Sequence, residues 1–177
     1  MFVMSDPVAH DDFPLAYLIS IRCYGTWLPG DERGWVDPDH NDFGTPYRPP
    51  QRGLAQSTVK NLTQDPYSLD AQRRSLVLDA IIKVCEHREY TLEAAHVLDN
   101  HLHTVVRAKV KPEPIMNAFK SYASRALNES NLDTDDRKRW SRHGSTRWLW
   151  KIEEVERAIQ YTLDEQGQRM AWYERPM

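Results

Sequence analysis

The sequence predicts one α+β domain of the ferredoxin-like kind, a split βαβ sandwich whose antiparallel sheet carries helices on one face, plus a C-terminal helix. Apolar segments at strand and helix spacing follow one another in the order β, α, β, β, α, β, α. The 177 residues, 40% of them hydrophobic, suffice for one core and are too few for two ordinary domains. We expect the domain over residues 16–168, with tails at 1–15 and 169–177.

The first expected strand is AYLISIRC, residues 16–23, and an unusual segment follows it. Residues 24–66 hold five of the seven glycines and six of the eleven prolines, which argues against regular structure. The segment also contains large apolar residues that a disordered linker normally lacks. We interpret it as a long ordered surface loop that either binds a ligand or covers an edge of the core. Those apolar residues are Trp27, Leu28, Trp35, Phe43 and Tyr47.

The remaining elements follow from spacing and caps. Ser68 and Asp70 are candidate N-caps for a helix that continues to about Arg88, because apolar residues recur there at helical intervals. Asp99 and Asn100 provide a turn between two strands, which predicts an antiparallel hairpin. The expected ranges after the first helix are strands at 90–97 and 101–109, a helix at about 113–129, a strand at 145–150 and a helix at roughly 152–168.

Composition excludes several classes of protein. No stretch approaches the roughly 18 apolar residues that a membrane helix needs, and residues 1–7 (MFVMSDP) do not resemble a secretion signal. The two cysteines, Cys23 and Cys85, cannot form a disulfide framework or a four-thiolate zinc site. We therefore expect a protein of the reducing cytoplasm that does not associate with membranes.

Charge is unevenly distributed along the chain. The net charge is only −3, but residues 107–151 contain eleven Lys or Arg against five Asp or Glu, a net +6 that leaves −9 elsewhere. Trp140, Trp148 and Trp150 are interleaved with these bases, a combination suited to an unpaired nucleic-acid strand. The alternative interpretation is a solvated basic face with three core tryptophans.

His101 and His103 are the first candidates for chemistry. Side chains alternate between the faces of a strand, so these two imidazoles emerge on the same side. Two neutral imidazoles that converge in this way supply half of a metal site. A structural or accidental pair is the alternative, although a strand otherwise built from Val, Leu and Ala offers no apolar reason for two histidines.

Two tyrosines are candidate nucleophiles, and helix geometry separates them. Tyr122 falls within the apolar stripe of its helix, which favours a packing role. Tyr161 points away from the stripe of the last helix, so it is either a functional residue or an ordinary surface tyrosine. One turn beyond Tyr161, periodicity favours Glu165 as a third metal ligand over Asp164 and Gln166, with a solvated carboxylate as the alternative.

These residues resemble the single-tyrosine HUH transposases of bacterial insertion sequences, including the REP-associated tyrosine transposases. The resemblance covers most of the chain from Ala16 to about Gln168 and rests on the strand 101–103 after an Asn-containing turn, a helix with Lys120, and a later helix with Tyr161. Three segments look like those of one transposase-like subgroup: YGTWLPGDERG at 24–34, RHGSTR at 142–147 and YTLDEQG at 161–167.

The resemblance implies a metal-dependent transposase that cleaves and rejoins single-stranded or hairpin DNA. Tyr161 would be the nucleophile and form a 5′-phosphotyrosine link. His101, His103 and either Glu165 or Gln166 would hold Mg²⁺ or Mn²⁺, because many relatives place an amide four residues after the tyrosine, whereas here the amide comes fifth. It also implies a homodimer associated with the bacterial nucleoid. The expected DNA contacts are Lys120, Arg125, Arg142, His143, Arg147 and Trp148.

Two other functions are compatible with parts of the sequence. A domesticated relative would bind single-stranded nucleic acid without catalysis. A two-histidine phosphoesterase requires a pair of His-x-Ser/Thr motifs, and only His143-Gly144-Ser145 has that spacing. The phosphoesterase is therefore disfavoured.

Overall fold

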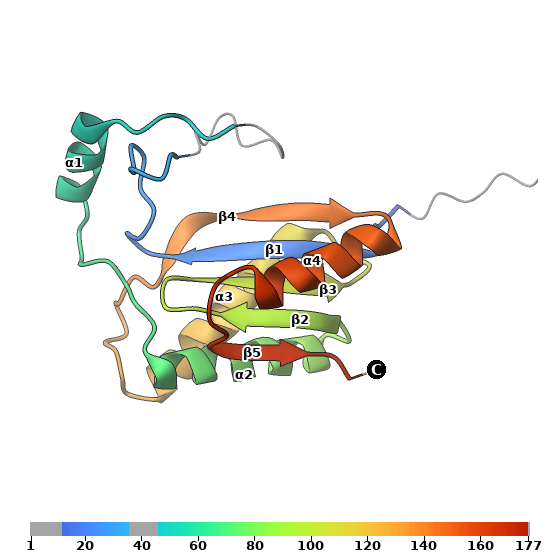
Figure 1. Cartoon of the computed structure of the whole chain (residues 1–177). Helices are drawn as coiled ribbons and strands as arrows, with labels where there is room; N and C mark the ends of the chain where they lie inside the picture. The colour runs from blue at the N-terminus through green and yellow to red at the C-terminus, as the bar shows by residue number, and fades with distance from the viewer. Residues whose placement is uncertain (1–11, 36–45, 177) are drawn as a thin grey trace, which may run out of the picture.

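The computed structural model describes residues 12–35 and 46–176, and its centre is one antiparallel sheet. Five strands are hydrogen-bonded in the order β4-β1-β3-β2-β5 (Figure 1). The sequence-adjacent strands β2 and β3 form the expected hairpin, and β1 lies between β3 and β4. The strands are β1 (Ala16–Cys23), β2 (Thr91–Val97), β3 (His101–Arg107), β4 (Trp140–Leu149) and β5 (Ala171–Glu174).

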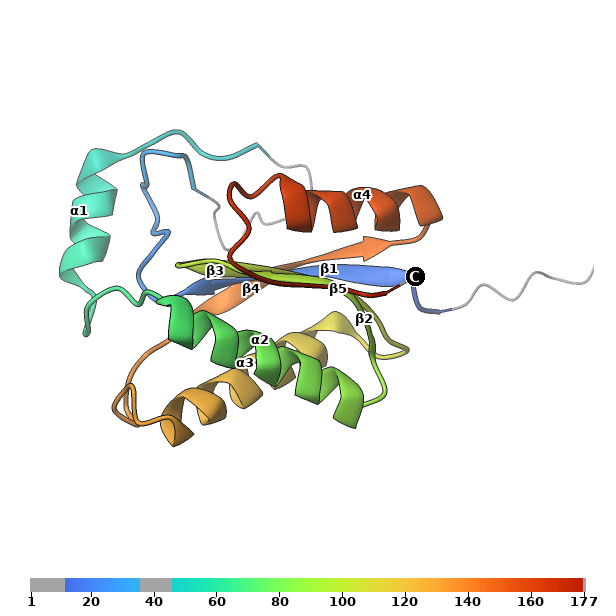
Figure 2. The same ribbon diagram turned by 60° about the horizontal axis from the view of Figure 1, so that its bottom comes forward.

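Helices cover both faces of this sheet. Figure 2 shows α2 (Ala71–His87) and α3 (Pro112–Glu129) on one face and α4 (Ile152–Asp164) on the other. A large core that includes Phe119 and Ile81 fills the α2/α3 side, and a smaller one that includes Val155 and Leu163 lies under α4. This architecture confirms the ferredoxin-like α+β class, with the C-terminal helix on the face opposite to the other two.

The sequence also explains where two of the helices begin. The Asp70 carboxylate accepts the Arg73 backbone N–H at 2.8 Å, which caps α2 at the position predicted. At α4, the backbone N–H groups of Trp150 and Lys151 donate to the Glu154 carboxylate at 2.8 and 3.1 Å. The acidic first turn of α4 also suits the positive end of the helix dipole.

Four expectations about element bounds are wrong. The segment 24–66 contains a helix, α1 (Arg52–Lys60), which has no buried residue and so lacked an apolar stripe. The stretch 169–177, expected as a tail, contains β5, which pairs with β2. Strand β4 begins at Trp140 instead of residue 145, because Trp140 pairs with Cys23 beyond a register shift. Helix α4 ends at Asp164, four residues before the expected end.

The segment after β1 is an ordered loop that packs against α1. Gly30 has a φ of +89°, and a Cβ atom there would come within 2.5 Å of the Ala55 backbone nitrogen. Only glycine fits such a position, so the loop can approach α1 closely. Trp35 is buried and donates its indole N–H to the Pro49 carbonyl at 3.2 Å. Phe43, another aromatic residue noted in this segment, lies outside the described residues.

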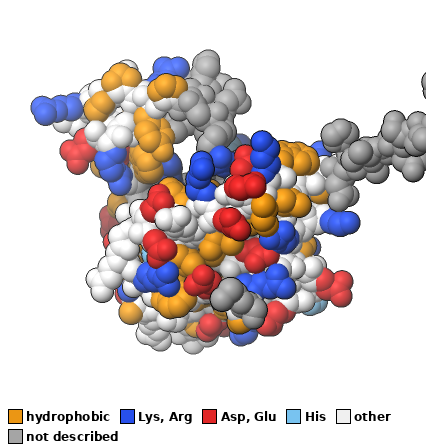
Figure 3. Space-filling model, turned by 45° about the vertical axis from the view of Figure 1, so that its right-hand side comes forward, with side chains coloured by type: hydrophobic (Ala, Val, Ile, Leu, Met, Phe, Trp, Pro, Cys, Tyr) orange, Lys and Arg blue, Asp and Glu red, His pale blue; other side chains and the backbone are white. Residues whose placement is uncertain are grey.

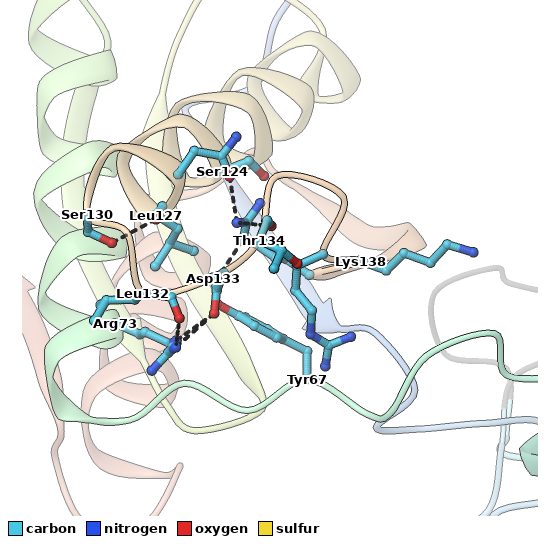
Figure 4. A network of polar contacts seen from close by, with 12 residues as sticks. Tyr67, Arg73, Ser124, Leu127, Ser130, Leu132, Asp133, Thr134 and Lys138 are labelled. Atoms are coloured by element: carbon cyan, nitrogen blue, oxygen red, sulfur yellow. Dashed lines mark hydrogen bonds and ion pairs between the residues drawn. The ribbon is translucent and has the colours of Figure 1, made fainter.

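A buried polar network fixes the connection between α3 and β4 (Figure 4). Its centre is Asp133, which forms ion pairs with Arg73 at 2.8 Å and Arg139 at 3.1 Å and accepts the Tyr67 hydroxyl at 2.5 Å. Burial, together with the hydrogen bond to Asp133, raises the pKa of Tyr67 to about 12. Arg139 also donates to the Asn128 side chain, so the start of β4 is tied to the end of α3.

The two cysteines have no disulfide partner, and both are buried. Burial raises the pKa of each thiol to about 12, which makes both thiols poor nucleophiles. Among the helices in the described part of the chain, none is long and apolar enough to cross a bilayer.

Candidate functional site: a histidine pair facing a tyrosine helix

The histidine pair lies at the middle of the sheet, on the face covered by α4. His101 and His103 are separated by one residue on β3, and their ring centroids are 5.0 Å apart. His103 is directly opposite Ser20 of β1, whose hydroxyl is 2.6 Å from the His103 Nδ1 atom. Strand alternation therefore places both rings on one face, as the sequence predicted.

Hydrogen bonds orient both imidazole rings. The Nδ1–H of His101 donates to the Asn100 side-chain oxygen at 2.6 Å, so the lone pair of the neutral ring is on Nε2. For His103, the Nε2–H donates to the amide oxygen of Gln166 at 3.2 Å, so Nδ1 accepts the proton of the Ser20 hydroxyl. A hydroxyl can also accept, so Ser20 would support the other tautomer of His103 equally well.

Both imidazoles are held in the neutral form. Burial, followed by the proximity of His101, lowers the pKa of His103 to about 3. Burial is also the largest cause of the lowered pKa of His101, although a hydrogen bond with Gln166 opposes it. A neutral imidazole has a lone pair available for a cation, which is the condition for a metal ligand.

Helix α4 brings a tyrosine and an amide to this pair. The ring centroid of Tyr161 lies 5.3 Å from that of His103, and the Tyr161 side chain is 37% exposed. Because α4 ends at Asp164, the chain turns and presents Gln166 to the site instead of continuing the helical rotation. Gln166 is further fixed by its own side-chain N–H, which donates to the Tyr161 carbonyl at 3.2 Å.

The third position differs from the expectation based on periodicity. Glu165, which helical spacing favoured, is the exposed C-cap of α4. Asp164 forms an ion pair with Arg169 at 2.7 Å. Gln166 is the residue of the three that the structure brings into hydrogen-bond contact with the histidine pair. The helical projection was misleading because it assumed a helix that continues to about residue 168.

The donor set of this site suits a divalent cation. Two neutral imidazoles and one amide oxygen are ligands that Mn²⁺ accepts, and the amide oxygen also suits Mg²⁺. Within residues 12–35 and 46–176, no group of three or more His, Cys, Asp or Glu side chains could hold a metal. The Gln166 amide oxygen, which contacts His103, is placed to supply a third ligand beside the two imidazoles.

Sequence reasoning missed His96, which ties the tyrosine helix to the sheet. His96 lies beside His103 on β2 and is fully buried. Its Nε2 accepts the Met170 backbone N–H at 3.0 Å, so its Nδ1–H donates to the Thr162 carbonyl at 2.9 Å. His96 thus binds the chain on both sides of Gln166. The sequence did contain a signal for His96: it lies five residues before His101, and the short turn of the hairpin brings β2 alongside β3.

The expected DNA contacts do not gather at the histidine pair. Lys120 and Arg125 are on α3, which covers the opposite face of the sheet. The Lys120 ammonium donates to the Ser141 carbonyl at 3.0 Å and, more weakly, to that of Arg142, so it joins α3 to β4. Arg142 and His143 are exposed on β4, which is an edge strand.

Two of the three tryptophans in the basic segment are exposed. Trp148 and Trp150 are 37% and 51% exposed, and their rings are tilted with centroids 5.8 Å apart. Trp148 also packs edge-on against Tyr17, on the sheet face opposite to the histidine pair. Trp140 is half-buried and donates its indole N–H to Ser124. From the sequence, all three tryptophans had the same two interpretations, either as stacking residues or as core residues, and the structure separates Trp140 from the two exposed ones.

Nearly half of the bases in the segment 107–151 serve the fold. Arg139 is buried in the Asp133 network, and Arg107 forms an ion pair with Glu93. Lys120, Arg137 and Lys138 donate to backbone or side-chain oxygens nearby. Arg147 is on β4 opposite Leu18, a residue that packs under α4. On the face drawn in Figure 3, basic and acidic side chains are interspersed, without one continuous patch of either sign.

A model of a known protein family matches part of the chain. Residues 67–151 match the family model described as "Transposase IS200 like". This region contains the histidine pair, whereas β1 and the α4 segment with Tyr161 and Gln166 lie outside it.

The other comparisons are more distant. Among solved structures, the chain is similar to a REP-associated tyrosine transposase bound to a REP hairpin, with 12% identity and a TM-score of 0.47. That match covers 90% of this chain and 70% of the transposase in the structure. No curated protein matches the chain.

Proposed function

We propose that this protein is a transposase that cleaves and rejoins single-stranded DNA, with Tyr161 as the nucleophile. The observation that carries the proposal is the convergence of Tyr161 and Gln166 on His101 and His103, about sixty residues earlier in the sequence. The two histidines lie within the region that matches the IS200-like transposase model. Single-stranded or hairpin DNA would be the substrate.

In the proposed reaction, the Tyr161 phenol oxygen attacks the phosphorus of a DNA phosphodiester. A bond from the Tyr161 oxygen to phosphorus forms, and the bond from phosphorus to the 3′ oxygen breaks. The phenol proton is lost and the departing 3′ oxygen gains one, which leaves a 5′-phosphotyrosine and a free 3′-hydroxyl. Attack by a 3′-hydroxyl on the phosphotyrosine reverses these steps and joins two strands without an external energy source.

His101, His103 and Gln166 would hold Mg²⁺ or Mn²⁺ at this site. A cation bound there withdraws charge from the phosphoryl oxygens. The contribution of the chain is positional: Asn100 and Ser20 orient the two imidazoles, and the hydrogen bond from Gln166 to the Tyr161 carbonyl fixes the amide beside the tyrosine. The remaining exposure of Tyr161 leaves room for the substrate to reach its hydroxyl.

Covalent capture of DNA tests the proposal. A pool of single-stranded oligonucleotides with a hairpin stem, randomised flanks and a 3′ fluorophore is incubated with the protein in Mn²⁺ and separated on a denaturing gel. We expect a labelled protein–DNA adduct from the wild type. Tyr161→Phe should abolish it while changing the dissociation constant for the pool less than about threefold, because the ring and its packing remain.

Tyr122→Phe is the matched control, since Tyr122 is half-buried on α3, on the opposite face of the sheet. This variant should form the adduct as the wild type does. Adduct of undiminished yield from Tyr161→Phe would contradict the assignment of the nucleophile. Tight binding without an adduct from the wild type across the pool would instead indicate a domesticated binding protein.

A further inference from the structure

An arginine from β1 lies beside the histidine pair, and none of the observations above gives it a role. Arg22 is directly opposite His101 in the register of β1 and β3, and Ser20, two residues before it, contacts His103. Strand alternation therefore places Arg22 on the same face as both imidazoles. The Arg22 charge contributes to the lowered pKa of both histidines, which confirms that the three side chains are neighbours.

The Arg22 guanidinium forms no ion pair in the described part of the chain, although the Asp31 carboxylate is close enough to raise its pKa. Ion pairs and side-chain hydrogen bonds between residues of 12–35 and 46–176 do not include it. Its guanidinium carbon instead lies 3.6 Å from the ring centroid of Trp27. Burial lowers the pKa of Arg22 and the charge of Arg33 adds to this shift, whereas Tyr47, Tyr161 and Asp31 oppose it. Burying a guanidinium that forms no ion pair costs folding free energy, and a bound anion would offset this cost.

Arg33, in the loop after β1, is a useful comparison because its guanidinium forms an ion pair. Arg33 lies on the Trp27 ring as well, at 5.1 Å, but it binds both carboxylate oxygens of Asp31 at 2.8 Å. Arg33 also donates to the Thr26 carbonyl at 3.0 Å. Its charge and donors are therefore used within the loop, whereas the Arg22 donors remain available toward the site.

Trp27 forms a rigid support for Arg22. Its indole N–H donates to the Gly34 carbonyl at 2.7 Å, and its ring lies 5.5 Å from that of Tyr47. The loop is joined to the end of the β2–β3 turn through Thr26, which donates to the Cys23 carbonyl at 2.8 Å and approaches the Asn100 carbonyl. A guanidinium stacked on a fixed indole loses little freedom when it binds a planar or tetrahedral oxyanion.

We propose that Arg22, supported by Trp27, binds a non-bridging oxygen of the DNA phosphodiester that occupies the histidine pair. Its charge would then oppose the negative charge that accumulates on the phosphoryl oxygens as Tyr161 attacks, while its fork of donors fixes the phosphate against the sheet. This assignment rests on the proposed strand cleavage, and it explains why the loop 24–35 is folded against the end of β3.

The test compares Arg22→Gln and Arg22→Lys with Arg88→Gln, which removes the same charge from an exposed position at the end of α2. The adduct rate is measured in Mn²⁺ with the 3′-labelled hairpin pool at saturating DNA. The dissociation constant and its salt dependence are measured by anisotropy in the Tyr161→Phe background. Circular dichroism melting checks that each variant is folded.

We expect Arg22→Gln to slow adduct formation at saturating DNA by about 100-fold or more, the loss found when one preorganised donor to a developing charge is removed. It should also reduce the salt slope of binding by about 1. Arg22→Lys should restore part of the rate, because it retains the charge without the fork, and it serves as the test if Arg22→Gln does not fold. Arg88→Gln should react within twofold of the wild type.

A wild type that forms adducts while Arg22→Gln reacts within twofold of it would overturn the inference and leave the proposed function intact. A wild type that forms no adduct with the pool would overturn the proposed function. In that case the binding data decide about Arg22. A weaker dissociation constant and a smaller salt slope for Arg22→Gln would support phosphate binding, and unchanged values would overturn it.

Discussion

Protonation of His103 should make the metal-free protein less stable in mild acid. In the folded chain the pKa of His103 is lowered to about 3, whereas an unfolded histidine has a pKa near 6.5. Above pH 6.5 the side chain is neutral in both states and contributes no pH dependence. As the pH falls below 6.5, the unfolded chain takes up a proton that the folded chain does not accept, so the free energy of unfolding decreases.

The magnitude follows from the distance between the working pH and the unfolded pKa. At pH 5 the unfolded His103 is about 1.5 units below its pKa, and each unit corresponds to about 1.36 kcal/mol, so the expected loss is about 2 kcal/mol. The assay is urea unfolding in EDTA at pH 7.5 and pH 5.0, for the wild type and for His103→Gln. The variant lacks the titrating group but can still hydrogen-bond Ser20.

The wild type should therefore lose about 2 kcal/mol more than His103→Gln between the two pH values. His143→Gln, which replaces an exposed histidine on β4, is the matched control and should behave as the wild type does. Equal losses for the wild type and His103→Gln would refute the reasoning, because they would mean that His103 accepts a proton in the folded protein as readily as in the unfolded chain.

Two further predictions concern the fold and the third metal ligand. Asp133→Asn leaves the buried Arg139 without its counter-charge and should lower the free energy of unfolding by about 3 kcal/mol, measured by urea unfolding; a loss below about 1 kcal/mol would contradict the importance of this network. Gln166→Ala should raise the Mn²⁺ concentration for half-maximal adduct at least about tenfold, whereas Glu165→Ala should leave it unchanged; the reverse pattern would restore the carboxylate as the ligand.

The sequence predicted most elements of the sheet and its helices because each has an apolar pattern of its own. The strands around His101 and the helix that Asp70 caps were found within two residues of their bounds. Helix α1 escaped detection because it buries no residue, and the density of glycine and proline around it indicated a loop. Strand β5 has only four residues, so its pairing with β2 depends on the tertiary fold and not on a local pattern.

The site was predictable in its histidines and its tyrosine, but not in the residues that position them. Alternation on β3 needs no knowledge of neighbouring strands, so it paired His101 with His103 correctly. Arg22 and Ser20 carry a comparable signal, since they are the polar residues that alternate with the buried Ile19 and Ile21. That pattern indicates only that they share a face. The register of β1 against β3 determines which side chains of the two strands lie next to each other. This register cannot be predicted from the residue spacing within one strand.

Gln166 shows why the end of a helix matters as much as its periodicity. Projection along an ideal helix places Glu165 under Tyr161, and this holds only while the backbone continues at 3.6 residues per turn. His96 accepts the Met170 N–H and donates to the Thr162 carbonyl, so it draws the chain after Asp164 back onto the sheet. The helix ends there because a buried imidazole on β2 offers the backbone other partners. The identity of the amide that meets the histidine pair is therefore set by a third histidine, which periodicity along α4 does not reveal.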